Sequence, residues 1–225
     1  MADSPFSSIL NTDQHWLGEL RMWLQQQGFV TTSSASSAVR YRKTSAKTVN
    51  TSTSATDLLN GEITVAAGVM GSNGLLRLTA WGDQLQNSGG AAAPQRFQLV
   101  FGGTTLLDTS TGGSSAANAS RGSWRIVAEI LNLGAVNSQM SSLQVHLTTR
   151  GNVNSSETVV GFATGEGSYQ GVVGGADGIT YLGHGVNPST SVDTSAAKAL
   201  VLNVINGSAS ASYETKLLGA VVEII

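Results

Sequence analysis

The chain has 225 residues and a net charge of −2, and 40% of its residues are hydrophobic, which is enough for one large domain or two small ones with a sizeable core. Only 12% are charged, so hydroxyl and amide groups must supply much of the solubility. A net charge this small creates no field that attracts nucleic acid or an anionic membrane. The absence of cysteine excludes disulfides, thiolate metal sites and cysteine nucleophiles.

An amphipathic α-helix is predicted over about residues 13–27. Asn11, Thr12 and Asp13 are potential N-cap residues, and Gly28 is a natural stop. One helical face is apolar, and it carries Trp16, Leu17, Leu20, Trp23 and Leu24. A polar linker over residues 31–37 follows, so residues 1–37 are predicted to form an N-terminal arm. The helix either packs on its own chain or docks into another subunit, and its two tryptophans suit docking.

A basic segment begins the region after the linker. Val39 and Tyr41 alternate with Arg40 and Arg42, a period of two that predicts a strand. Together with Lys43 and Lys47, the two arginines make up a third of all lysines and arginines in the chain. Such a cluster can contact phosphates, but a solvated strand or a contact with an acidic partner is commoner. We treat these four cations as a secondary contact candidate.

The rest of the chain alternates in the manner of β-strands. The clearest case is Leu76, Leu78 and Ala80, which ends at Trp81-Gly82-Asp83, and glycine-rich turns separate the runs. This pattern predicts an all-β antiparallel sandwich over residues 38–225. The other predicted runs are Ile63 to Val69, Phe97 to Leu107, Trp124 to Leu133, Leu143 to Thr149, Thr158 to Phe162, Ala199 to Ile205 and Tyr213 to Ile225.

Three stretches carry more specific expectations. The apolar C-terminal run KLLGAVVEII would promote aggregation at an exposed edge, so we expect it in the middle of a sheet or at a subunit interface. Leu200 to Ile205 is apolar on nearly every position and is predicted to be buried on both faces. The glycine-rich segments Gly112 to Gly122 and Gly161 to Gly185 are predicted to be surface loops.

No arrangement of residues indicates catalysis or metal binding. His15, His146 and His184 are far apart and lack the spacing of metal ligands, although Gly183 and Gly185 would expose His184 in a loop. The chain has no Gly-x-Ser-x-Gly elbow, and its glycine-rich segments are not followed by a helix. Asp83, Asp108, Glu129 and Glu157 could supply a glycosidase pair, but nothing in the sequence brings two of them together. We expect no catalytic residues, no metal and no cofactor.

Several of these stretches resemble structural proteins of tailed-bacteriophage particles. The resemblance rests on Leu76-Arg77-Leu78-Thr79-Ala80-Trp81-Gly82-Asp83, on Asn87-Ser88-Gly89 and on Phe101-Gly102-Gly103-Thr104-Thr105 followed by Asp108. Thr56-Asp57-Leu58, Val192-Asp193-Thr194-Ser195 and Leu218-Gly219-Ala220-Val221-Val222-Glu223 fit the same pattern. The resemblance spans roughly residues 48–225 and leaves out the N-terminal helix.

That family implies a jelly-roll-like β domain, a homotrimer and no enzymatic activity. Its members include capsid decoration (cement) proteins, head fibres and some tail proteins. The leading expectation is a cement protein on the capsid exterior, with the major capsid protein as partner and the apolar helix stripe as the capsid contact. The main alternative is a head- or tail-fibre module that binds a host surface glycan. The short chain without heptads or long repeats favours the cement protein.

Overall fold

A computed structural model of the chain describes residues 38–89, 93, 95–109, 117–148, 159–161, 164–173 and 179–225. The predicted arm, with its helix, its linker and its capsid-contact residues, lies outside these ranges. The described residues form strands and loops without a helix, so no helix able to cross a membrane is found among them. The predicted all-β class is therefore confirmed for this part of the chain.

Within the described ranges the strands form two sheets, and all strand pairs are antiparallel. The large, nine-stranded sheet contains, in spatial order, β1 (Ala38–Lys43), β14 (Tyr213–Ile224), β5 (Leu75–Gln86), β8 (Asn118–Asn132), β9 (Gln139–Thr148), β12 (Ile179–Thr190), β11 (Glu166–Val173) and β10 (Val159–Gly161), while β2 (Lys47–Asn50) also pairs with β14. The small, five-stranded sheet contains β3 (Thr56–Asp57), β13 (Lys198–Ile205), β6 (Arg96–Phe101) and β7 (Thr104–Asp108), with β4 (Thr64–Val65) also on β13.

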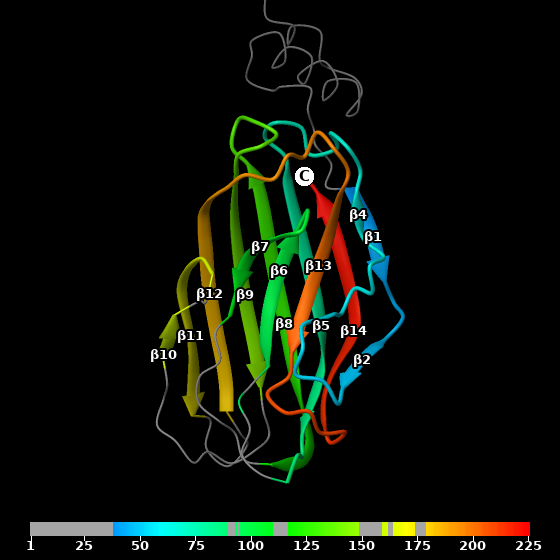
Figure 1. Ribbon diagram of the computed structural model, residues 1–225, viewed down its shortest axis with the longest axis vertical. Helices are drawn as coiled ribbons and strands as arrows, with labels where there is room; N and C mark the ends of the chain where they lie inside the picture. The colour runs from blue at the N-terminus through cyan, green and yellow to red at the C-terminus, as the bar shows by residue number, and fades with distance from the viewer. Residues whose placement is uncertain are drawn as a thin grey trace, which may run out of the picture. The chain divides into compact units, whose positions relative to one another are not determined.

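The small sheet covers one face of the large sheet, as Figure 1 shows for β6, β7 and β13. The alternation predicted from the sequence is confirmed, because Leu76, Leu78 and Ala80 of β5 are fully buried. The inward residues of β6, β8, β9 and β13 join them in one hydrophobic core that both sheets share. The opposite face of the large sheet is open along β5, β8, β9 and β12, where alternate residues are exposed or half-buried.

The C-terminal run lies inside the large sheet. β14 pairs with β5 along one side and with β1 and β2 along the other, so its backbone groups are bonded in both directions. The first of the two predicted locations is therefore confirmed. Since the run is already paired within its own chain, it no longer argues for a subunit interface.

Several sequence expectations were wrong in detail, and the predicted run Ile63 to Val69 is a strand only at Thr64–Val65. β5 does not end at Trp81-Gly82-Asp83 but continues to Gln86. Gly82 serves close packing instead, because a Cβ there would lie 1.9 Å from the carbonyl oxygen of Lys216 and 2.6 Å from the ring of Trp124. β13 is buried on one face only, since no described strand covers the outer side of the small sheet and Val201, Asn203 and Ile205 are half-buried there.

The segment Gly161 to Gly185 is not a surface loop, because it contributes β11 and part of β12. Its glycines permit close backbone pairing: a Cβ on Gly167 would lie 2.2 Å from the carbonyl oxygen of His184 on the neighbouring strand. The other glycine-rich segment, Gly112 to Gly122, ends within β8, which begins at Asn118. Glycine content predicts loops poorly where strands approach this closely.

Candidate functional site

The open face of the large sheet carries a band of side chains that runs across the strands. In one row Trp81 of β5 is opposite Arg125 of β8, which is followed by His146 of β9 and Leu182 of β12. The adjacent row contains Val127, Gln144 and His184 on β8, β9 and β12. We call these seven residues the outer band. They share one face because residues two apart along a strand point the same way.

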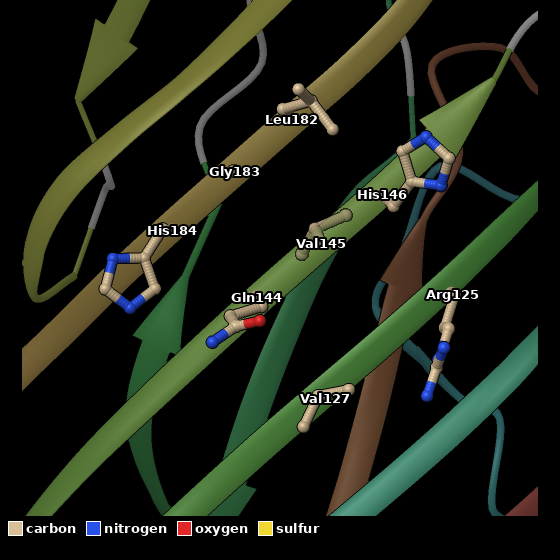
Figure 2. Close-up of a pocket in the computed structure, with 8 residues that line it drawn as sticks. All are labelled: Arg125, Val127, Gln144, Val145, His146, Leu182, Gly183 and His184. Carbon is tan, nitrogen blue, oxygen red and sulfur yellow. The ribbon is translucent and has the colours of Figure 1, made fainter.

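The outer band is hollowed over β8, β9 and β12. The hollow has a volume of about 690 Å³. Figure 2 shows that its side chains come from these three neighbouring strands. Its lining consists of Arg125, Val127, Gln144, Val145, His146, Leu182, Gly183 and His184, and none of these is a carboxylate. Leu182 is 49% exposed, a high value for a leucine on a paired strand.

Trp81 extends the outer band beyond the hollow. Its side chain is 41% exposed, and its indole ring lies against Gly219 of β14. A Cβ at Gly219 would come within 2.5 Å of Cζ2 of that ring, so only glycine lets the ring lie this close to the sheet. The glycine therefore positions an exposed aromatic surface beside Arg125.

Ion pairs border the outer band on both sides. On one side Arg77 bonds Glu129 at 2.8 Å. On the other, Arg121 bonds both Asp83 and Glu214, the latter at 2.6 Å. Burial lowers the pKa of Arg121, but the hydrogen bonds to the two carboxylates outweigh this and raise it. The Arg77–Glu129 pair is balanced one to one, whereas Arg121 faces two carboxylates, so both flanking arginines are engaged within the protein.

The polar groups of the outer band itself are free of such partners. Among the described residues, no hydrogen bond or ion pair engages the side chains of Arg125, Gln144, His146 or His184. They therefore offer an uncompensated guanidinium, an amide and two imidazoles to solvent or to a ligand. The sequence contained one signal for this surface, namely the residues that alternate with the buried ones on β8 and β9.

The four basic candidates do not form one exposed patch. Lys43 is 4% exposed, and its ammonium bonds Glu62 at 2.6 Å, while Lys47 bonds Asn60 at 2.5 Å. Arg42 is exposed, and for Arg40 the structure describes only the backbone, in β1. The β-bulge between Val39 and Tyr41 shifts the register of β1 on β14 within this segment. Two of the four cations are therefore already engaged within the chain.

A second, smaller cavity of about 240 Å³ lies beside this network. It is lined by Tyr41, Glu62, the segment 63–66, Val69, and Val222 and Ile224 of β14. Hydrogen bonds from Lys43 and Tyr41 lower the pKa of Glu62 from 4.5 to about 2. Burial, followed by the hydrogen bond to Glu62, raises the pKa of Tyr41 from 10.0 to about 12. Both shifts reflect one closed network at the edge of the sandwich.

The carboxylates considered for a glycosidase pair are not brought together. Asp83 and Glu129 each bond an arginine, and Glu129 is opposite Arg77, six residues from Asp83 along β5. Six strand residues span roughly 20 Å, well beyond the separation of a catalytic pair. Asp108 bonds Arg96 at 2.5 Å, which raises the pKa of that arginine, and Glu157 lies outside the described residues. In the part of the chain that the structure describes, no cluster of three or more His, Asp or Glu could hold a metal ion.

No protein-family model matches the chain, and no curated protein matches it. Among solved structures it is similar to one described as the CBM2 module of the evolved Dit of Lactobacillus casei BL23 phage J-1. The alignment covers 71% of the present chain and 66% of the phage module, which is slightly under two thirds of the module's length. The sequence identity is 11% and the TM-score is 0.22. A likeness at that TM-score assigns neither a fold family nor a ligand to this chain.

Proposed function

We propose that the protein is a non-enzymatic structural component of a tailed-bacteriophage particle, with a jelly-roll-like domain over residues 38–225. The support is the residue pattern shared with that family, which falls on defined elements here. Leu76 to Asp83 lies in β5, and Phe101 to Thr105 spans the end of β6, the turn at Gly102 and Gly103, and the start of β7. The observation that carries a binding role is the outer band, an exposed surface with free polar groups and no pair of carboxylates across it.

Within that role we propose a homotrimeric decoration protein on the capsid exterior. The apolar stripe of residues 16–24 would contact the major capsid protein, and the sandwich would form the trimer. Burial of one large apolar side chain contributes roughly 1.5–3 kcal/mol, and repetition across a trimer multiplies the effect.

Light scattering and particle binding test this proposal. Purified protein should have three times the chain mass of 23.1 kDa. Deletion of residues 1–30 should leave a folded trimer that no longer binds particles lacking the protein. A stable monomer at micromolar concentration, or normal decoration by the truncated chain, would contradict the respective half of the proposal.

A second candidate function is a head- or tail-fibre module that binds a host surface glycan. The observation that favours it is the exposed indole of Trp81 beside the hollow over β8, β9 and β12. A glycan array probed with the purified protein tests it. Binding that disappears in Trp81→Ala would support this function, and an array without any signal would argue against it.

A further inference from the structure

We propose that the outer band binds an acidic oligosaccharide laid across the strands, with its anionic group on Arg125. This inference rests on the second candidate function and gives the chemical class of its ligand. From Trp81 to Leu182 the band crosses three strand spacings, about 14 Å. A short oligosaccharide can therefore contact both ends of the band at once.

Charge determines the class of ligand. Of the described arginines on the open face of β5 and β8, Arg77 and Arg121 bond carboxylates, whereas the side chain of Arg125 has no such partner within the described ranges. His146 and His184 line the same hollow, and no carboxylate does. A carboxylate or phosphate of the ligand would accept a charge-assisted hydrogen bond from the guanidinium of Arg125. A neutral sugar would leave that guanidinium without an anion.

The remaining contacts suit a sugar chain. The indole of Trp81 presents a flat apolar surface, on which the C–H face of a sugar ring can stack. Gln144 offers an amide donor and an amide acceptor for hydroxyl groups. Leu182 and Val127 supply apolar contact within the hollow. Apolar walls with a few placed polar groups are typical of small-ligand sites.

Other occupants fit the face less well. A peptide added as a strand needs an unpaired sheet edge, whereas β5, β8, β9 and β12 are each paired on both sides. Nucleic acid needs several cations along its backbone, and the hollow holds one arginine and no lysine. A second copy of this chain would have to cover the ion pairs that border the band, which favours a narrow ligand over a broad protein surface.

Titration calorimetry of the full chain with three probes tests the proposal. The probes are a galacturonate tetrasaccharide, a neutral maltotetraose and inorganic phosphate. We expect the acidic tetrasaccharide to bind at least about tenfold tighter than the neutral one, as the loss of a charge-assisted hydrogen bond implies. Phosphate alone should bind more weakly than the acidic tetrasaccharide, because it reaches only Arg125.

Matched variants locate the contacts. Arg125→Gln should abolish the preference for the acidic tetrasaccharide, whereas Arg77→Gln, on the same face but paired with Glu129, should retain it. Trp81→Ala should weaken the binding of both saccharides about tenfold or more. Gly219→Ala tests the positioning of the indole, since the new Cβ displaces the ring. It should reduce saccharide binding and change the tryptophan fluorescence, while binding of phosphate alone stays unchanged.

Several outcomes would overturn the proposal. These are equal binding of acidic and neutral saccharides, phosphate binding as tight as the acidic tetrasaccharide, or no binding of any probe. Self-association that Trp81→Ala abolishes would instead identify the outer band as an interface between copies. None of these outcomes affects particle attachment through residues 1–30, so failure of this inference is distinguishable from failure of the decoration role.

Discussion

Trp124 and Trp81 lie on neighbouring strands of the large sheet and point to opposite faces. Each ring covers a glycine of an adjacent strand, Gly82 for Trp124 and Gly219 for Trp81. Trp124 is 2% exposed, its indole N–H donates to the carbonyl of Asp83 at 3.1 Å, and its ring centroid is 5.4 Å from that of Phe97. Trp81 is 41% exposed. The same packing arrangement, a tryptophan ring over a glycine, thus fills the core on one face of the sheet and presents an aromatic surface on the other.

The largest effect should come from the inner tryptophan. Trp124→Ala removes a fully packed ring and leaves a cavity, so we expect the free energy of unfolding to fall by about 3–5 kcal/mol. Urea denaturation of both proteins measures the difference. A loss below about 1 kcal/mol would mean that the stability of the core does not depend on this ring.

Gly82→Ala should be the next most damaging change. Its Cβ would overlap the backbone carbonyl of Lys216, which no side-chain rotation relieves, and would also meet the ring of Trp124. We expect a loss of about 1–3 kcal/mol in the free energy of unfolding. Gly219→Ala is the matched control, because the three atoms nearest to its Cβ all belong to the partly exposed ring of Trp81 and none to the backbone. Equal losses of unfolding free energy in Gly82→Ala and Gly219→Ala would contradict the difference in packing between the two faces of the large sheet.

The hydrogen-bonded network of Tyr41, Lys43 and Glu62 predicts that the stability of the protein depends on pH. The pKa of Glu62 is about 2 in the folded protein, against an ordinary value of 4.5. The stability that Glu62 contributes is therefore present above about pH 4.5 and is lost as the pH falls through 2. Thermal unfolding of the wild type and of Glu62→Gln should differ more at pH 5 than at pH 2. If the two proteins lose stability in parallel over that range, Glu62 is not coupled to folding as described.

The outer tryptophan should have the smallest effect on stability. Trp81→Ala removes a side chain that is 41% exposed, so the free energy of unfolding should fall by only about 1 kcal/mol, well below the loss for Trp124→Ala. Urea denaturation of Trp81→Ala and Trp124→Ala in parallel shows whether the two stability losses differ as the exposed fractions of the two side chains predict. A loss comparable to that of Trp124→Ala would make Trp81 part of the core and would remove the case for a binding surface.

Alternation of residue types predicted the all-β class and the inward residues of β5, β6, β8 and β9. Side chains two apart share a face whatever the sheet order, so this information is local. The burial alternation along β8 and β9 places Arg125, Val127, Gln144 and His146 on the face opposite the core. Alternation could not show that Trp81, Arg125, His146 and Leu182 form one row, because that depends on the pairing register of four strands.

The sequence by itself determined the inward residues of β5, β6, β8 and β9, because hydrophobic residues at a period of two require a core, but it did not show that β13 is buried on one face only. The tertiary structure alone decided which glycines are packing sites, since Gly82 looks like the end of a strand and Gly219 has no evident role until the tryptophans over them are seen. It also decided which cations are free: Lys43 is bonded to Glu62, while no partner within the described residues engages Arg125. Both outcomes depend on contacts between residues distant in the chain, and local sequence patterns do not encode those distances.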